Sequence, residues 1–257
     1  GATRRVDGRH DGMRGAFLGP AYDDEEMAAV LRERGIPAER LAHPSAVAQR
    51  VAERVAAGAV VGVLQGRAEF GPRALGARSI LADARSPKMQ SVLNLKIKFR
   101  ESFRPFAPVV LAERAAEFFE MSGESPYMLF TAPVCPARRR PVETAPTLHA
   151  RLQALRSDIP AVTHVDYSAR VQTVAAETNP FLHAVLTAFD RLTGCPVMIN
   201  TSFNVRGEPP VCHPREALDG FLHTEMDVLA LGAFIVEKTR LDPARLPVGG
   251  ARTFAPD

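Results

Sequence analysis

The chain has 257 residues, of which 46% are hydrophobic and 24% charged, as is typical of a globular protein with a sizeable core. This composition argues against a disordered chain, and three cysteines without CxxC spacing argue against a disulfide framework or a zinc finger. A net charge of +3 suits small anionic ligands and nucleic acid alike. No apolar run is long enough for a membrane span and no secretion signal is found, so we expect a cytoplasmic protein without membrane contact.

The first half of the chain is expected to begin with a linker, residues 1–18, which is rich in Gly, Arg and Asp. Asp23 or Asp24 can cap a helix that ends before Gly35, and Val47, Val51 and Val55 mark one face of a helix over 44–57. The further predictions are a buried strand at 59–64, a strand at 79–82, a helix opened by Ser86 and Pro87 that ends near Lys98, a strand at 109–111 and a helix through Phe119.

The second half opens with a segment, 131–158, whose prolines and arginine triplet predict a surface insertion. We then predict strands at 162–165 and 170–174, a helix over 180–193, a strand at 196–200, a helix over 214–223, strands at 228–231 and 234–237, and a flexible tail over 240–257. Because strands and helices mix without strict alternation, we expect one α/β domain over 19–239, with a twisted sheet and flanking helices.

Cationic side chains gather in three loops next to predicted strands or helices, where α/β proteins often bind ligands. The loops offer Arg67, Arg73 and Arg78, then Lys96, Lys98, Arg100 and Arg104, and finally Ser202, Asn204 and Arg206. Taken singly, a cation at a helix end is most often solvated or pairs with the helix dipole. Proline beside Arg73 and Arg104 restricts the backbone, however, and favours a preorganised site for phosphate or carboxylate oxygens.

Four motifs carry a resemblance to a known family. They read GRAEFGPRALGARSILAD from Gly66, KIKFRESFRPFAP from Lys96, DYSARVQTV from Asp166 and NTSFNVRGEPPVC from Asn200. Over residues 16–238 the chain strongly resembles the C-terminal domain of the O-carbamoyltransferases of nodulation and antibiotic tailoring. The fold implied is YrdC-like, a twisted mixed α/β sheet with flanking helices and a concave ligand face.

The resemblance implies an activity and a set of ligand residues. The domain would use ATP, with Mg²⁺ on the nucleotide, to convert carbamoyl phosphate into carbamoyl adenylate for transfer to a hydroxyl of a natural product. The positions that match the family's ligand residues are Arg73, Lys98, Arg104, Arg170, Ser202 and Asn204, and we expect Arg73, Lys98 and Arg104 to take part in catalysis. Tyr167 and Val171 stand where the family usually has Gly and Pro, which bears on the pocket near Arg170.

Members of this family also carry an N-terminal domain, similar to actin and Hsp70, that binds metal and performs the transfer. Nothing in this sequence matches that domain, so we expect it as a partner domain or subunit. The seven histidines form no HxxxH or HExxH pair, and we therefore expect no metal site built from this chain. The sequence leaves a homodimer open.

Two other interpretations remain at this stage. The chain could be a basic YrdC-like module that binds nucleic acid without catalysis, although 14 phenylalanines, three tyrosines and no tryptophan offer no evident stacking platform. It could also be an assembly domain with a decayed site, which the intact set of cations disfavours. Glu69 is equally compatible with a structural ion pair and an orienting role, while Cys195 and Cys212 are expected to be structural.

Overall fold

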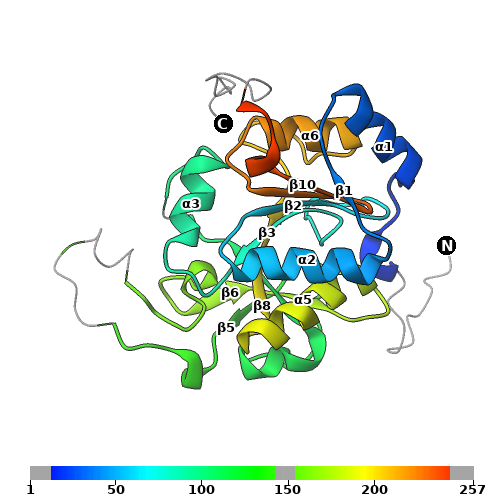
Figure 1. Cartoon of the computed structure of the whole chain (residues 1–257). Coiled ribbons are helices and arrows are strands. Elements are labelled where there is room, and N and C mark those ends of the chain that lie inside the picture. The colour runs from blue at the N-terminus through cyan, green and yellow to red at the C-terminus, as the bar shows by residue number, and fades with distance from the viewer. Residues whose placement is uncertain (1–12, 103, 143–146, 148–153, 244–257) are drawn as a thin grey trace.

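Figure 1 shows a computed structural model of the chain, which describes residues 13–102, 104–142, 147 and 154–243. The strands are β1 Glu39–Arg40, β2 Val61–Leu64, β3 Arg78–Asp83, β4 Ala107–Leu111, β5 Thr131–Pro133, β6 Ser168–Arg170, β7 Gln172–Val174, β8 Val197–Ser202, β9 Val228–Leu231 and β10 Phe234–Glu237. The α-helices are α1 Asp24–Glu33, α2 Pro44–Ala56, α3 Met89–Lys96, α5 Pro180–Thr193 and α6 Pro214–Leu222. Short 3-10 turns are η1 Arg14–Ala16, η2 Ala112–Glu117, η3 Pro136–Arg138, η4 Pro160–Val162 and η5 Lys238–Arg240.

The strands form one large mixed sheet in the order β1-β10-β9-β2-β3-β8-β4-β7, and β5 pairs with β6 in a separate ribbon. Within the large sheet, β2 runs parallel to β9 and β4 parallel to β7, whereas the other neighbours are antiparallel. Every residue of β2, β3 and β4 is buried, which explains why the sequence of β2 shows no polar alternation. The predicted mixed α/β class, with a sheet and flanking helices, is confirmed.

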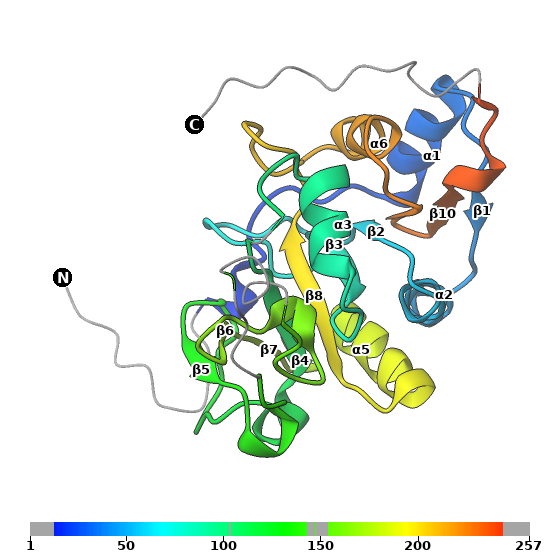
Figure 2. The same cartoon turned by 90° about the vertical axis from the view of Figure 1, so that its left-hand side faces the viewer.

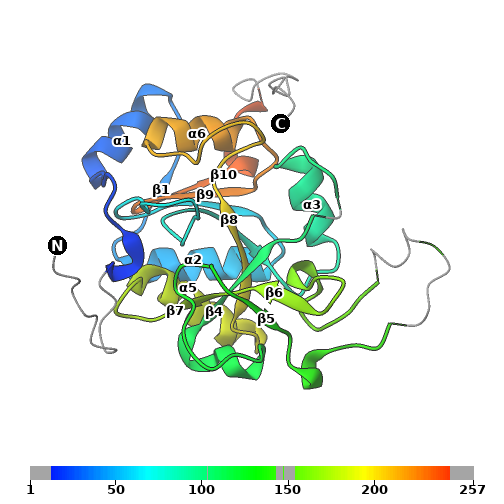
Figure 3. The same ribbon diagram turned by 180° about the vertical axis from the view of Figure 1, so that it is seen from behind.

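Helices cover both faces of this sheet (Figures 1 and 3). On one face α2 packs against α5, and their apolar sides share a core cluster that includes Val51 and Phe189. On the other face α1, α3 and α6 contribute Leu31, Leu93 and Phe221 to a second cluster. Strand β8 serves both clusters, since Ile199 belongs to the second and its neighbour Met198 to the first. The β5–β6 ribbon lies beside β4 and β7 (Figure 2).

Several local predictions are wrong, each for an identifiable reason. The carbonyl of Ser86 accepts from the Met89 amide, three residues later, so Ser86 begins a turn. Helix α3 starts only after this turn, at Met89. The helix expected through Phe119 is the 3-10 segment η2. Instead of a strand at 162–165, the chain forms the turn η4, which begins with Pro160. The strand expected over 170–174 is divided between β6 and β7 at Val171, whose amide bonds the carbonyl of Phe130.

The expected linker and insertion are partly within the described residues. In the first, Ala16 is buried in a small cluster with Leu75 and Met128, and its carbonyl accepts from the Phe70 amide. In the second, β5 pairs with β6, so this part of the 131–158 segment is built into the domain. Residues 1–12, 143–146, 148–153 and 244–257, including most of the expected tail, lie outside the described residues.

The side chain of Arg78, at the start of β3, contacts several loop segments that lie far apart in the sequence. Arg78 is 2% exposed, and among the described residues its side chain donates hydrogen bonds only to main-chain carbonyls. The acceptors are the carbonyl oxygens of Pro20, Gln65, Gly66, Ala77 and Cys212. Burial lowers the pKa of Arg78, and the Glu69 carboxylate acts in the opposite direction. One guanidinium thus joins the segment before α1, the loop after β2 and the loop before α6.

Glu69 holds the same loop through hydrogen bonds to its main-chain amides. One of its oxygens accepts the amides of Leu75, Ala77 and Arg78, at 2.7, 2.7 and 3.2 Å. The carboxylate takes the place of the carbonyl acceptors that these three amides would have in a helix or strand. It thereby holds a loop that has no regular secondary structure of its own.

We expect Arg78→Met to lower the free energy of unfolding by about 3 kcal/mol or more, because several carbonyls lose their donor in a buried region. Urea unfolding would measure the loss. The control is Arg67→Met in the same loop, since exposed Arg67 makes one hydrogen bond within the described part of the chain, to the Leu18 carbonyl at 3.1 Å. Its effect should stay within about 0.5 kcal/mol. Equal losses in the two variants would contradict the central role of Arg78.

Candidate active site

Lys98, Ser202 and Asn204, which lie far apart in the sequence, meet where α3 and β8 end. Lys98 is 5% exposed, and its Nζ donates to the Asn204 carbonyl and to Asn204 Oδ1, both at 2.9 Å, and to the Ser202 carbonyl. Ser202 Oγ donates to the same Oδ1 at 2.6 Å, and Asn204 Nδ2 donates to the Glu208 carbonyl at 2.6 Å. The structure therefore brings three of the six predicted residues together, with the lysine bound to protein oxygens.

The amine of Lys98 has a pKa well below that of an ordinary lysine. Burial, with a smaller contribution from the nearby Arg100 guanidinium, lowers the pKa of Lys98 to about 7. Among the described residues no carboxylate pairs with its amine, and its partners are carbonyl, amide and hydroxyl oxygens. A proton on this amine is therefore held less firmly than on an ordinary lysine, and a nearby anion would favour the charged form.

The loop that contains Arg104 is held by a residue that the sequence analysis did not single out. Asn94 is fully buried in α3, and its Nδ2 donates to the carbonyls of Ser102 and Arg104, at 3.0 and 2.7 Å. Its Oδ1 accepts from Arg100 Nε at 2.6 Å. The side chain of Arg104 itself is about half exposed and pairs with Glu101 at 3.1 Å. The only sequence signal for Asn94 is a polar residue within the apolar pattern of the predicted helix.

Arg170, at the end of β6, and Arg73, in the loop before β3, form a second cationic group. Burial lowers the pKa of Arg170, and the positive charge of Arg73 lowers it further. Arg170 Nε is buried and has no hydrogen-bond partner in the part of the chain that the structure describes. Arg73 is exposed, and neither it nor Arg170 forms an ion pair with a carboxylate of the described residues. This arrangement suits an anion with several oxygens.

Buried amides position the loop that carries Arg73. Asn200 Nδ2 donates to the Ala74 carbonyl at 3.1 Å and to Gln172 Oε1 at 2.6 Å. Gln172 Nε2 in turn donates to the Leu75 carbonyl at 2.9 Å. Asn200 and Ser202 are two residues apart on β8, so one strand supports both cationic groups. Asn200 and Gln172 lie inside family-like motifs, yet their residue types alone gave no reason to choose them.

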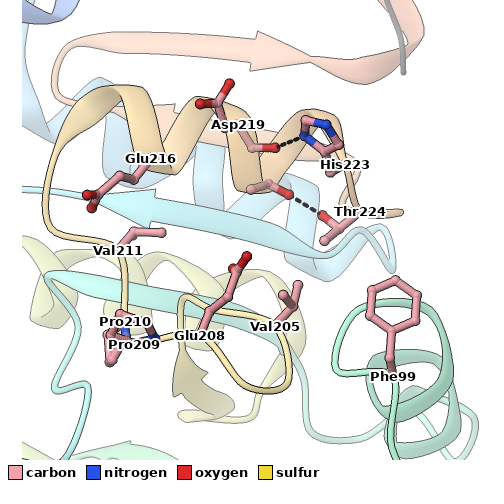
Figure 4. A pocket seen from close by; sticks show the side chains of 11 residues that line it. Phe99, Val205, Glu208, Pro209, Pro210, Val211, Glu216, Asp219, His223 and Thr224 are labelled. Carbon is pink, nitrogen blue, oxygen red and sulfur yellow. Dashed lines mark hydrogen bonds between the residues drawn. The ribbon is translucent and has the colours of Figure 1, made fainter. Parts of the chain in front are cut away.

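A cavity of about 310 Å³ lies between α6 and the loop after β8 (Figure 4). Its lining includes Phe99 and Val205, the immediate neighbours of Lys98 and Asn204, but none of the six predicted residues. A wider cavity of about 680 Å³ separates α3 from residues 154–165 and also contains none of the six. Lys98 and Asn204 therefore adjoin the first cavity through their sequence neighbours Phe99 and Val205 but are not among the residues that line it.

The described residues contain no cluster of three or more His, Cys, Asp or Glu side chains suited to a metal ion. Within the same residues, no helix combines the length and apolar character needed to cross a membrane.

The fold and these cationic loops agree with a match to the family described as carbamoyltransferase C-terminus, whose model covers residues 52–238. The chain therefore belongs to this family of carbamoyltransferase C-terminal domains. It is 48% identical to the protein sll1178 of Synechocystis over 92% of the chain and 39% of that protein. It is also 44% identical to nodulation protein NolNO of Sinorhizobium fredii, over 77% of the chain and 27% of the relative. Nodulation protein NolO of Bradyrhizobium diazoefficiens is 43% identical over 75% of the chain and 32% of its own length.

The chain thus spans about two fifths or less of the length of these curated relatives. A solved structure of full-length HypF in its phosphate- and nucleotide-bound form aligns with 67% of this chain and 19% of HypF. Its TM-score is 0.42 at 16% identity, a similarity too weak to show a shared fold.

The charge state of Lys98 predicts a pH-dependent stability. Its amine titrates near 10.5 when exposed and near 7 in the folded protein, so between these values the unfolded chain binds more protons. The contribution of Lys98 to the free energy of unfolding is therefore smallest at and below pH 7 and increases toward pH 10.5. The difference between wild type and Lys98→Met should increase across this window, by at most about 1.4 kcal/mol per pH unit.

Urea unfolding of both proteins at a series of pH values measures this difference. Lys96→Met is the control, since Lys96 pairs with Glu225, which raises the pKa of Lys96 above 10.5. Its difference from wild type should stay flat until the upper end of the window. A flat difference for Lys98→Met would show that the amine keeps its proton and would contradict the lowered pKa.

Proposed function

We propose that this chain activates a carbamoyl group as the adenylate, using carbamoyl phosphate and ATP. Family membership supports carbamoyl transfer as the general class of activity. The observation that carries the proposal is Arg170, whose buried Nε has no hydrogen-bond partner among the described residues and whose pKa is lowered by burial and by the charge of Arg73. Such a pair suits a phosphate or a carbamate better than a neutral ligand.

The proposed reaction has two balanced steps. Water first cleaves carbamoyl phosphate into carbamate and inorganic phosphate, releasing one proton. A carbamate oxygen then attacks the α-phosphorus of ATP in line, the bond from that phosphorus to the bridging oxygen breaks, and pyrophosphate leaves. Negative charge accumulates on the leaving oxygens, so fixed cations are the contribution required of the protein.

The cations of this chain fit distinct parts of that reaction. We assign the carbamate and its phosphate to Arg73 and Arg170, and the phosphates of the nucleotide to the region of Lys98 and Arg104. Ser202 and Asn204 hold the lysine in place. Mg²⁺ would come with the nucleotide, whose phosphate oxygens are the ligands it prefers, and would neutralise their charge.

The final transfer to a hydroxyl is assigned to a second domain. The curated relatives are more than twice as long as the part that this chain matches, which leaves room for one. Because the chain resembles the O-carbamoyltransferases, we infer that a metal-binding, actin-like domain occupies that length. The acceptor would be chosen by that domain.

We expect the chain, with Mg²⁺, to release pyrophosphate from ATP only when carbamoyl phosphate is present. Arg170→Met should lower kcat/KM for this release on the order of 100-fold, because one preorganised guanidinium is lost from the reacting centre. Arg170→Lys should recover little of it, since lysine cannot form the two parallel bonds of a guanidinium. A coupled pyrophosphate assay measures these values.

The matched control is Arg191→Met, which removes an exposed guanidinium near the end of α5. Its activity should equal that of the wild type. Release of ADP instead of pyrophosphate, or equal turnover with acetyl phosphate, would refute the reaction. Full activity of folded Arg170→Met would remove Arg170 from the site.

A further inference from the structure

The buried asparagine of α3, Asn94, occupies a position that an apolar residue would fill more favourably. It is fully buried, and its neighbours Leu93 and Ile97 belong to the core cluster beneath this helix. Asparagine is a weak helix former, and burial of an amide costs free energy unless its polar atoms are paired. The helix and the core therefore do not explain this residue, and the explanation lies in its hydrogen bonds.

All the hydrogen bonds that the side chain of Asn94 makes with described residues go to the segment after α3. We call this segment, residues 98–102 and 104, the cationic loop. The two hydrogens of Nδ2 bind the main-chain carbonyls of Ser102 and Arg104, at 3.0 and 2.7 Å, and Oδ1 accepts from Arg100 Nε at 2.6 Å. The Asn94 carbonyl also accepts from the Arg100 amide at 3.0 Å. One side chain thus fixes the main chain of the loop and the direction of one guanidinium.

Arg100 is held on two sides by neutral groups. Its Nε binds the amide oxygen of Asn94, and its guanidinium carbon lies 4.9 Å from the centre of the Phe106 ring. Among the described residues, no carboxylate forms an ion pair with Arg100, and its two Nη atoms make no hydrogen bond. Contact with an amide and an aromatic face restricts a guanidinium and leaves its charge in place. Arg100 therefore keeps both a fixed direction and a full positive charge.

The neutrality of Asn94 matters because the cationic loop concentrates positive charge. Burial lowers the pKa of Arg100, and the charge of Arg104 lowers it further. The charge of Arg100 in turn contributes to the lowered pKa of Lys98. A carboxylate in place of Asn94 would bind Arg100 more strongly, through a charge-assisted bond, but would cancel one of these charges. An amide offers an acceptor oxygen at no cost in charge.

We propose that Asn94 is a positioning residue, which orients Arg100 and the main chain around Arg104 without neutralising the cations of the loop. Asn94 itself touches no ligand and acts through these two arginines. The inference rests on the proposed function, which assigns the phosphates of the nucleotide to the region of Lys98 and Arg104. It adds a residue behind that region whose chemistry determines how strongly the region binds a polyanion.

Two substitutions separate orientation from charge. Asn94→Asp keeps an acceptor oxygen for Arg100 but adds a negative charge, whereas Asn94→Leu keeps nearly the same size and removes every side-chain hydrogen bond. Ser91→Asp is the matched control, because it adds the same charge at an exposed position of the same helix. Isothermal titration calorimetry at one salt concentration would measure the Kd of inorganic tripolyphosphate, and urea unfolding would measure stability.

Both variants of Asn94 should raise the Kd of tripolyphosphate about tenfold or more, because one loses the charge of Arg100 and the other its direction. Ser91→Asp should change the Kd by less than about twofold, since an exposed charge is screened. When Arg100→Gln is already present, Asn94→Asp should raise the Kd by less than about threefold further, because the guanidinium through which it acts is absent. A merely structural residue would lower stability and leave the Kd of the folded protein unchanged.

A further measurement needs no substitution of Asn94 and serves if its variants do not fold. The Arg100 Nε–H resonance, assigned by its loss in Arg100→Gln, should exchange with solvent at least about tenfold more slowly than that of exposed Arg191 in NMR spectra. Equal exchange rates would overturn the inference. So would wild-type affinity in both folded variants of Asn94, or a wild type that does not bind tripolyphosphate.

These binding results are separate from the fate of the reaction. If pyrophosphate release requires carbamoyl phosphate while both folded Asn94 variants bind tripolyphosphate as the wild type does, the proposed function stands and the positioning role fails. If the variants lose affinity but the wild type releases no pyrophosphate, Asn94 positions the cations of an anion site and the proposed reaction fails.

Discussion

The guanidinium of Arg78 is the constraint on which the loops around the start of β3 depend. A buried cation normally needs a carboxylate in contact, but here the partners are five carbonyl oxygens from three separate segments. Those segments carry no regular structure that could hold them, so the charge replaces the hydrogen bonds that a helix or strand would provide. Glu69 supplies the complementary acceptor for the amides of the same loop. Together they hold a glycine-rich segment still enough to present Arg73.

Strand β8 connects the loop that carries Arg73 with the group around Lys98. Its Asn200 fixes the loop before β3 through Ala74, and its Ser202 belongs to the group that binds the Lys98 amine. Both residues lie on a strand whose neighbours on either side are buried, so their positions are set by core packing and not by loop chemistry. Substitutions that shift β8 in the core should therefore change the positions of both cationic groups.

The long periodic elements could be predicted from the sequence, and the conformations of the cationic side chains could not. The valine spacing of α2, the Asn179–Pro180 start of α5 and the apolar run of β2 each follow from one local signal. In contrast, the separation of β6 from β7 depends on a bond from Val171 to a distant carbonyl, which no local pattern encodes. Charge alone likewise could not distinguish half-exposed Arg104, paired with Glu101, from Arg170, whose Nε has no hydrogen-bond partner among the residues that the structure describes.

The bonds of Lys98 have a consequence for how ligands act on one another. A protonated amine has three hydrogens, and the carbonyl and amide oxygens of Ser202 and Asn204 already take them. A phosphoryl oxygen that gained one of these hydrogens would release part of the turn, and Val205 in the cavity wall is the next residue. Occupancy on the anionic side would thereby alter the shape of the apolar side without touching it. An anion at Lys98 and a group in the cavity would then bind non-additively, with a coupling free energy that is the same in both directions.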